Sequence, residues 1–351
     1  MKTVDYIVVG LGLAGMVFCD QLEQHQKSFV VYDGDFPSAS KVAAGLINPV
    51  ILKRYTIPWK GEEQFDLAIS YFSRLSEILN LNAVDVMPIY KVFSSAEDQN
   101  NWFEASDKPG LNRFIKDELI RNNSETLRAP YGKGEVLESV RIRISQLLQA
   151  YSERLKNQDR FVDESFDYDA LELDGDQGVI YKGVKAKAII FAEGFRLKNN
   201  PHFNKLPLVG NKGEYLIIRA PELCLKQASK STFFVIPLGD DLYKVGATFN
   251  WNEKDSNVTA SAREELQAYL SKILLCEYEV VDQEAGVRPT TGDRRPLLGR
   301  HPKHPALVLL NGLGTRGTMM APYLAQLLYE HLENHIPLDD SVSITRFPKK
   351  F

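Results

Sequence analysis

Apolar residues at the start of the chain form short runs on either side of a segment with helical periodicity. Residues 4–9 form a continuous apolar run, and residues 29–33, FVVYD, form another, both with the composition of buried strands. Between them, from Ala14 to about Gln24, apolar side chains recur at the spacing of one helix face. The pattern predicts a unit of strand, helix and strand at the N-terminus.

The middle of the chain changes pattern twice. Residues 46–135 contain the helix-like stretches EEQFDLAISYFSRLSEILN and EDQNNWFEA, separated by short strands such as MPIYKVF, and we interpret this segment as inserted structure. Residues 140–157, VRIRISQLLQAYSERLKN, are amphipathic in the helical period. The run KAKAIIFAEG then ends a strand in a small turn closed by glycine, which returns the chain to the first sheet.

A series of strand-like runs follows, namely EYLIIRA, FFVIPLG and LYKVGATFNW, and after them comes the helical pattern SAREELQAYLSKIL. Turns separate these runs, which predicts an antiparallel sheet. From LVLLNGLG onward the chain resumes strand, glycine turn and helix, and this helix is expected to reach about Asn334, ahead of Pro337. The two ends of the chain are therefore expected to build one domain.

Composition and charge exclude several classes of protein. The 351 residues are 44% apolar and 25% charged, which is ordinary for a globular chain with room for about two domains. The formal net charge is −4, and Lys and Arg are interspersed with Asp and Glu, which disfavours a nucleic-acid partner. No apolar run reaches the roughly 18 residues that a membrane span needs, so we expect no such span.

The cysteines bear on the compartment. Cys19, Cys224 and Cys276 are far apart, odd in number and in no metal-like spacing. We therefore expect buried thiols in a reducing, cytoplasmic compartment and no disulfide framework. The pair His331 and His335 has a spacing that can hold a metal, but no third ligand is evident, so we expect surface histidines and no metal site.

Gly10, Gly12 and Gly15 form a G-x-G-x-x-G motif between the first predicted strand and helix. Glycines there permit a tight turn and let the backbone approach a pyrophosphate, while the helix N-terminus supplies amide donors. Asp33 ends the next strand, where a carboxylate binds the ribose hydroxyls of a dinucleotide. The context favours a dinucleotide over a merely tight turn, and the carboxylate disfavours NADP.

A second glycine-rich turn, GLGTRG at residues 312–317, leads into the last predicted helix. The first motif leaves NAD and FAD open, but a simple nicotinamide dehydrogenase has no use for a turn folded back from the far end of the chain. A flavin gains negative charge on its pyrimidine edge when reduced, and backbone amides with the positive end of a helix would stabilise that charge. We therefore predict FAD, bound non-covalently because no cysteine lies in an attachment motif.

The ordered set of motifs resembles the D-amino acid oxidase superfamily of FAD enzymes, with glycine oxidases nearest within it. The resemblance rests on VVGLGLAG, SASKVAAGLINP, IIFAEG, YKVGAT, GVRPTTGDRRPLLGRHP and NGLGTRGTMMAP, which span residues 5 to about 330. It implies an α/β fold in which a Rossmann-like FAD-binding domain is interleaved with an antiparallel-sheet (α+β) substrate domain. We expect residues 1–50, 136–210 and 285–351 in the FAD-binding domain, and residues 51–135 and 211–284 in the substrate-binding domain.

The resemblance also implies the site residues. Those expected at the cofactor are Gly10, Gly12, Ala14, Gly15, Asp33, Ala43, Ala44, Gly45, Ala192, Gly194, Gly312, Gly314, Thr315, Arg316, Gly317 and Thr318. Arg288 matches the arginine that binds the substrate carboxylate in glycine oxidases. By itself, an arginine after Gly and Val in a polar turn is more often a surface or ion-pair residue.

The sequence leaves two interpretations open for several other candidate side chains. Arg316 is either a cation beside the reduced flavin or substrate carboxylate, or an exposed residue at a helix N-terminus. Tyr215 and Tyr243 are candidate hydrogen-bond donors to the substrate, Tyr243 being the one we include in the site, although most tyrosines simply pack. Thr248 is expected to be structural, and Asp293 is expected to stabilise its turn by pairing with Arg294 or Arg295.

These observations predict an FAD-dependent oxidoreductase that removes hydride from the carbon next to an amine of an amino acid or secondary amine. The resulting imine is hydrolysed by water, and the electrons pass to dioxygen or another acceptor. Because GLGTRG lacks the usual histidine of this loop, it is closer to the FAD domain of the enzyme that finishes 5-methylaminomethyl-uridine in tRNA. Action on a modified wobble uridine is therefore one alternative, opposed by the net charge, and a non-catalytic flavoprotein is another.

Overall fold

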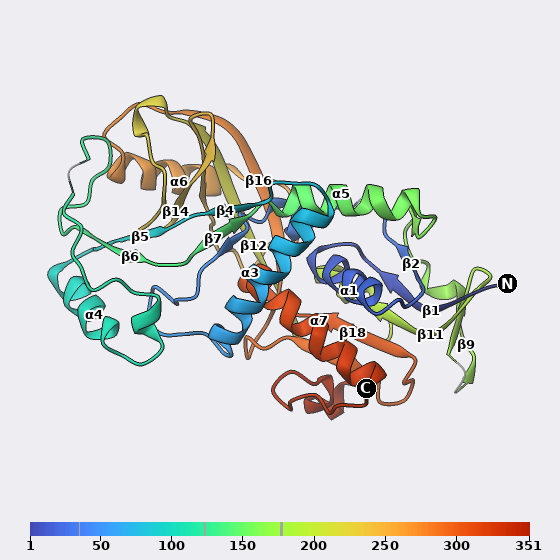
Figure 1. The fold of residues 1–351 in the computed structure, drawn as a ribbon. Coiled ribbons are helices and arrows are strands. Elements are labelled where there is room, and N and C mark those ends of the chain that lie inside the picture. Colours follow the sequence, from blue (N-terminus) through green and yellow to red (C-terminus); the bar gives the residue numbers. More distant parts are fainter. Residues whose placement is uncertain (35, 123, 176–177) are drawn as a thin grey trace.

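The computed structural model describes residues 1–34, 36–122, 124–175 and 178–351, which fold around two large sheets and one small sheet (Figure 1). The first, here called the parallel sheet, has the strand order β17-β18-β11-β1-β2-β8, with β10 and β9 added beside β11. Its strands are β1 (Lys2–Val9), β2 (Phe29–Tyr32), β8 (Phe161–Val162), β9 (Leu171–Leu173), β10 (Val179–Tyr181), β11 (Val184–Phe191), β17 (Leu297–Arg300) and β18 (Leu307–Asn311). β8, β2, β1, β11 and β18 all run parallel, so strands from both ends of the chain meet in one sheet.

The second sheet, here called the antiparallel sheet, has the order β16-β12-β15-β14-β13-β5-β6. Its strands are β5 (Ile89–Val92), β6 (Lys133–Val136), β12 (Leu208–Arg219), β13 (Ala228–Lys230), β14 (Phe234–Gly239), β15 (Leu242–Gly246) and β16 (Glu279–Thr291). All its neighbours are antiparallel except β13 and β5. The small sheet joins β3 (Leu46–Ile47), β7 (Val140–Ile142) and β4 (Val84–Val86).

The α-helices are α1 (Leu13–Gln24), α2 (Ala39–Val42), α3 (Gly61–Ile78), α4 (Ala96–Ser106), α5 (Ile144–Asn157), α6 (Ala260–Ile273) and α7 (Gly317–Glu333). Helices α1 and α7 lie side by side, although they come from opposite ends of the sequence (Figure 1). Helix α6 packs on one face of the antiparallel sheet, where Leu266 and Leu270 meet Leu216, Ile218 and Val245. The other face of that sheet is therefore left for the rest of the molecule.

Side chains that alternate along the strands of the parallel sheet form a separate hydrophobic core on each of its two faces. Val8, Ile190 and Val308 face the core that contains α1, α5 and α7, whereas Ile7 and Ile189 face a second core. Successive side chains of a strand point to opposite faces, and a parallel sheet covered on both sides reads as a continuous apolar run. This explains the uninterrupted apolar runs at residues 4–9 and 29–33.

Most predicted elements are present, with corrections that have physical causes. The N-terminal strand, helix and strand are confirmed, and α7 ends at Glu333, one residue before Asn334. The expected helix over 140–157 is wrong at its start, since residues 140–142 form β7, paired with β3 and β4. The alternation VRI satisfies a strand as well as a helix, and the neighbouring strands decide between them.

Other expectations also need correction. Arg288 lies within β16 and not in a turn, and the predicted strand LYKVGATFNW ends early, at Gly246. Cys19 is buried as expected, but Cys224 is exposed and Cys276 is half-buried. The division into two domains stays a prediction, and three of its boundaries fall inside β6, β12 and β16. Among the residues described, no helix has the length and hydropathy needed to cross a membrane.

Candidate active site

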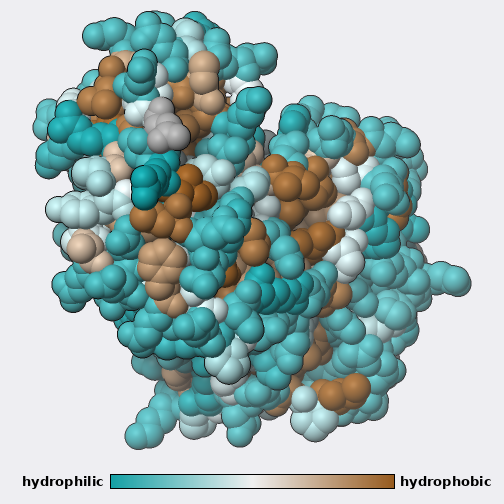
Figure 2. Space-filling view, turned by 60° about the vertical axis from the view of Figure 1, so that its left-hand side comes forward, coloured by the Kyte–Doolittle hydropathy of each residue, from teal (hydrophilic) through white to brown (hydrophobic). Residues whose placement is uncertain are grey.

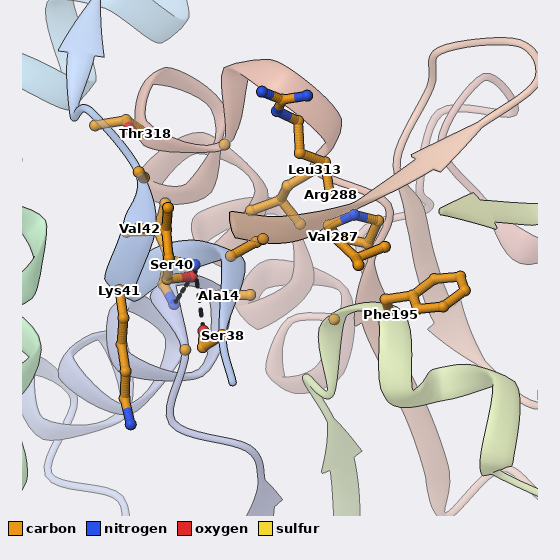
Figure 3. A pocket seen from close by; sticks show the side chains of 18 of the residues that line it. Ala14, Ser38, Ser40, Lys41, Val42, Phe195, Val287, Arg288, Leu313 and Thr318 are labelled. Carbon is orange, nitrogen blue, oxygen red and sulfur yellow. Dashed lines mark hydrogen bonds between the residues drawn. The ribbon is translucent and has the colours of Figure 1, made fainter. Parts of the chain in front are cut away.

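A cavity of about 1390 Å³ lies where the parallel sheet meets the free face of the antiparallel sheet. The carboxyl ends of β1, β2 and β11 border it on one side, together with α2, and β12, β13, β14 and β16 border it on the other. Figure 3 shows this arrangement, with Ser38, Ser40 and Lys41 near α2 and with Val287 and Arg288 on β16. The space-filling view shows a hollow between two parts of the molecule, with apolar side chains on both sides (Figure 2).

The turn after β1 is closed by contacts that leave no room for side chains. Gly10 has φ +93°, and a Cβ on it would lie 2.7 Å from the carbonyl oxygen of Ala192. A Cβ on Gly15 would lie 1.9 Å from the carbonyl oxygen of Gly10. Both glycines therefore let the turn close against backbone, which is the packing role that the fingerprint predicts.

Gly12 has a different environment. A Cβ there would meet only the hydroxyls of Ser40 at 3.3 Å and Ser38 at 3.7 Å, and Gly12 lines the cavity. Helix α1 begins here with no side-chain cap and no acidic residue in its first turn, although Ser40 Oγ accepts the amide of Leu13 at 3.0 Å. Gly12 and the start of α1 thus present open backbone to the cavity, as an anion at a helix N-terminus requires.

Asp33 follows β2 and lines the same end of the cavity. Burial raises the pKa of its carboxyl, while the amide of Leu11 and the positive charges of Arg196 and Lys41 act in the opposite direction. The carboxylate is thus already held by a backbone donor beside the glycine turn. This position agrees with the predicted contact to ribose hydroxyls.

The second glycine turn brings a half-buried cation to the cavity. Arg316 precedes α7, and its guanidinium donates to the carbonyl oxygens of Asn48 at 2.9 Å and Val50 at 3.4 Å. In the part of the chain that the structure describes, no carboxylate forms an ion pair with Arg316. Burial lowers the pKa of Arg316 to about 10, so the side chain is still a cation at neutral pH. The interpretation of Arg316 as an exposed helix-terminal residue is therefore wrong.

The residues around the cavity fit FAD. Helices α1 and α7 both begin at the cavity without a side-chain cap from the preceding residue, which suits phosphates at one helix N-terminus and the flavin pyrimidine edge at the other. Asp33 lies at the end expected for the adenosine ribose. The backbone around Gly12 leaves space for a pyrophosphate to approach it closely.

Arg288 reaches the cavity from the antiparallel sheet. Its Nη1 donates to the carbonyl oxygen of Thr248 at 3.4 Å, and the guanidinium lies 5.0 Å from the ring centre of Phe249. A Cβ on Gly213, in the neighbouring strand β12, would lie 2.0 Å from Nη2 of Arg288. Gly213, which the sequence did not single out, therefore makes the space in which this guanidinium lies.

The two candidate tyrosines lie on opposite faces of the antiparallel sheet. Tyr215 lines the cavity, with the ammonium of Lys244 at 4.7 Å from its ring centre. Tyr243 is buried in the core beneath α6 and does not line the cavity, so its placement in the site is wrong. Burial raises the pKa of Tyr243, and its phenol contacts the backbone of Leu225. Thr248 is structural, since its hydroxyl accepts the amide of Glu214 at 3.0 Å.

Most other predicted site residues come together at the cavity. Those that line it are Gly10, Gly12, Ala14, Asp33, Ala43, Ala44, Gly45, Ala192, Gly194, Arg288, Gly314, Thr315, Arg316, Gly317 and Thr318. Gly15 and Gly312 do not line the cavity; Gly15 acts through packing, and Gly312 has φ +77° in its turn. Their roles toward the cofactor stay predictions.

Some lining residues were missed, and one pairing was assigned to the wrong partner. Lys230, Phe234 and Ile236 line the cavity from β13 and β14, and only the pairing of strands could show this. Asp293 does accept the amide of Arg295 at 3.0 Å, as expected of a turn, but its ion pair is with Arg346 at 3.1 Å. His331 bonds the carbonyl oxygen of Ile336 near the end of α7.

Known proteins resemble this chain in both sequence and fold. The glycine oxidase of Bacillus subtilis is 22% identical over 98% of this chain and 97% of its own. The tRNA 5-methylaminomethyl-2-thiouridine biosynthesis bifunctional protein MnmC of Azoarcus is 25% identical over 48% of this chain, a match that spans only 30% of that protein. The crystal structure of glycine oxidase from Geobacillus kaustophilus superposes with a TM-score of 0.81 at 18% identity, covering 97% of this chain and 98% of that one.

The family model for FAD-dependent oxidoreductases of the DAO type matches residues 5–331. That range includes both glycine turns, Asp33 and Arg288, and so extends over nearly the whole chain. The interleaved α/β fold and the open helix N-termini at the cavity agree with this match. The chain therefore belongs to the DAO family of FAD-dependent oxidoreductases.

Proposed function

We propose that this enzyme oxidises the C–N bond of an amino acid or secondary amine. The observation that carries the proposal is Arg288, a guanidinium that lines the cavity on the side facing the two cofactor turns. No ion-pair partner of Arg288 lies among the residues that the structure describes. A planar guanidinium binds a carboxylate through two parallel hydrogen bonds, which also fixes the orientation of the bound molecule.

Bound FAD supplies the two-electron oxidation, and the chain supplies the positioning. Arg288 holds the substrate carboxylate so that the Cα hydrogen faces the cofactor side of the cavity. The first amides of α7 and the cation of Arg316 lie at the same side, where they stabilise negative charge that develops during the reaction. Holding the reacting groups in this geometry accounts for most of the catalysis expected from the chain.

The chemistry needs no general base from the antiparallel sheet. The substrate amine arrives neutral, gives up hydride from its α-carbon, and leaves as an iminium that loses a proton and is hydrolysed to a keto acid or aldehyde. Dioxygen or another acceptor takes up the two electrons. The sheet residues described at the cavity include no histidine and no carboxylate, which agrees with this route.

The direct test is an anaerobic titration of the purified yellow protein with glycine, sarcosine, and D- and L-amino acids. Bleaching of the visible flavin band by one of them is the expected result and names the substrate class. Admission of air then separates an oxidase from a dehydrogenase. A yellow protein that none of these amines bleaches would contradict the proposal and favour a flavoprotein without this turnover.

Variants of Arg288 test the carboxylate contact. We expect Arg288→Ala to weaken substrate binding by about 10- to 100-fold, because a charge-assisted hydrogen-bond pair is lost. Arg288→Lys should recover part of the affinity. Arg219→Ala is a matched control, since Arg219 is an exposed arginine at the end of β12 that does not line the cavity. Equal affinities in wild type and Arg288→Ala would remove Arg288 from the site.

A second candidate is oxidation of an amine carried by a modified tRNA uridine. Phe249 lines the cavity and is 61% exposed, and Trp251, two residues on, is 54% exposed. Exposed aromatic rings are the surfaces on which nucleobases stack. The net charge of −4 opposes a polyanion, so the candidate ranks second. It is tested by the same bleaching assay with tRNA that bears the amine.

A further inference from the structure

Lys230 is a second cation on the antiparallel sheet that the proposed function does not use. It ends β13 and lines the cavity. Its ammonium donates to the carbonyl oxygen of Thr232 and lies 4.9 Å from the ring centre of Phe234. An ammonium has three donors, and the described residues provide no carboxylate for it. Lys91, its neighbour on β5, is by contrast paired with Asp98 at 2.6 Å.

Strand pairing fixes the direction in which Lys230 points. Directly opposed residues of neighbouring strands share a face of the sheet. Lys230 opposes Phe234, Phe234 opposes Gly246, and Gly246 opposes Tyr215, so these four form one row across β13, β14, β15 and β12. Tyr215, Phe234 and Lys230 all line the cavity.

Arg288 belongs to the same face at the other end of the row. Tyr215 opposes Glu284 on β16, and Arg288 lies four residues further along that strand, which keeps the same side because side chains alternate. Four strand-to-strand steps separate β16 from β13. At about 4.8 Å a step across the strands and about 3.4 Å a residue along β16, the backbone positions of the two residues stand about 19 Å apart across the strands and about 14 Å apart along them. A molecule as small as glycine cannot bridge them.

The cavity wall between the two cations is apolar, and the one carboxylate of this row, Glu284, does not line the cavity and is paired with Lys244. Tyr215, Phe234 and Ile236 form it, and the described strands of this sheet contribute two cations and no carboxylate to the cavity wall. Burial and the charge of Lys91 lower the pKa of Lys230 to about 8. Among the described residues, no negative charge offsets the burial of its ammonium. A structural lysine would be expected to have a partner, as Lys91 has.

We propose that the substrate carries a second carboxylate, which Lys230 binds while Arg288 holds the first. The proposal rests on the function proposed above and names its substrate class: an amino acid whose side chain or nitrogen substituent is extended and ends in an anion. The apolar row of Tyr215, Phe234 and Ile236 binds the intervening carbon chain. Lys230 is then a specificity-determining residue that does not contact the reacting atoms.

The test measures binding without turnover. Aliphatic monocarboxylates and dicarboxylates of matched chain length, from succinate upward, are titrated into the holoenzyme at pH 7, and binding is followed by the change in the flavin absorption spectrum. We expect one dicarboxylate length to bind at least about tenfold tighter than the matched monocarboxylate, because a charge-assisted hydrogen bond is added. No preference at any length in the wild-type enzyme would overturn the proposal, whatever the variants do.

Variants assign the preference to Lys230. Lys230→Met keeps the length of the side chain and should remove the preference, whereas Lys230→Arg should retain it. Lys226→Met is the matched control, since Lys226 is exposed in the loop before β13 and does not line the cavity. A preference that survives in Lys230→Met would overturn the assignment.

The outcomes separate this proposal from the function on which it rests. If amines bleach the flavin and monocarboxylates bind but no dicarboxylate is preferred, only the second anion site is wrong. If dicarboxylates are preferred through Lys230 but no amine bleaches the flavin, the anion site stands and amine oxidation is wrong. Arg288→Ala should weaken both classes of ligand alike.

Discussion

The two ends of the cavity differ in the groups that form their walls. At the end near Asp33 the wall is backbone: the turn through Gly10 and Gly12 and the uncapped start of α1. At the other end the wall is side chains on one face of the antiparallel sheet, with Arg288 and Lys230 as its charges. A site of backbone amides depends on local conformation, whereas a site of side chains depends on which strands are neighbours.

A pair of glycines shows the difference most directly. At Gly15 an added Cβ would meet a backbone carbonyl oxygen at 1.9 Å, and at Gly213 it would meet the end of the Arg288 side chain at 2.0 Å. Backbone in a closed turn cannot move away, but a guanidinium can. Gly15 is therefore required for the fold, whereas Gly213 is required for the position of the Arg288 guanidinium.

The largest effect is expected for Gly15→Ala. The overlap with the carbonyl oxygen of Gly10 forces the turn open, and we expect the free energy of unfolding to fall by about 3 kcal/mol or more, at the upper end of the cost of overpacking. Urea unfolding of the apoprotein and the FAD content after purification measure it. Wild-type stability in this variant would show that the turn is not as closed as the structure has it.

Gly213→Ala should spare the fold and displace Arg288. We expect roughly a 30-fold loss of affinity for a monocarboxylate, since charge-assisted hydrogen bonds contribute about 1.5–3 kcal/mol. Binding is followed by the flavin spectrum and stability by urea unfolding. If the variant instead unfolds like Gly15→Ala while still binding carboxylate normally, the contrast between the two glycines is wrong.

Gly12→Ala should separate cofactor affinity from stability at the backbone end. Its φ of −74° suits alanine, and the nearest atom to the new Cβ is a serine hydroxyl at 3.3 Å. We expect the apoprotein to keep its stability but to bind FAD about tenfold more weakly, about 1.4 kcal/mol, because the Cβ occupies space that the pyrophosphate approaches. Quenching of FAD fluorescence on reconstitution measures this, and unchanged affinity would place the phosphates elsewhere.

The smallest expected effect is the contribution of Lys230, at the side-chain end of the cavity, to the pH dependence of stability. The pKa of Lys230 is lowered from 10.5 to about 8, so between these values the folded protein binds fewer protons than the unfolded chain and its stability rises with pH. The charged group that faces Lys230 is Lys91 on β5, itself held by Asp98 of α4. We expect a gain of about 1 kcal/mol from pH 8 to pH 9 in the apoprotein relative to Lys230→Met. Parallel pH profiles for the two proteins would contradict it.

The sequence predicted the two glycine turns and the cofactor class because the signal there is local. Gly10, Gly12 and Gly15 stand between an apolar run and a helical pattern, and each glycine acts on its own turn or on the first turn of α1. The same holds for residues 312–317, where the strand, the turn and α7 follow each other along the chain. The cofactor class and the family followed from these two turns and the motifs between them.

The substrate end could be predicted only through resemblance, and there the prediction failed for one tyrosine. Tyr243 lies three residues before Gly246, the partner of Tyr215, so alternation turns its side chain to the face covered by α6. A shift of one residue in register would exchange the two faces. Apolar periodicity showed that both tyrosines lie on strands but not which face is covered.

The sequence by itself determined the order of the elements, the dinucleotide turn and the second glycine turn, and its family resemblance supplied the candidate role of Arg288. The tertiary structure alone decided that Gly213 makes room for the Arg288 side chain, that Arg316 is half-buried against the carbonyl oxygens of Asn48 and Val50, and that Lys230 shares the cavity wall with Tyr215. The physical reason is the distance along the chain between the residues that interact. Turn geometry is fixed by φ angles within a few residues, whereas the facing of β12, β13 and β16 is fixed by pairing between strands far apart in the chain.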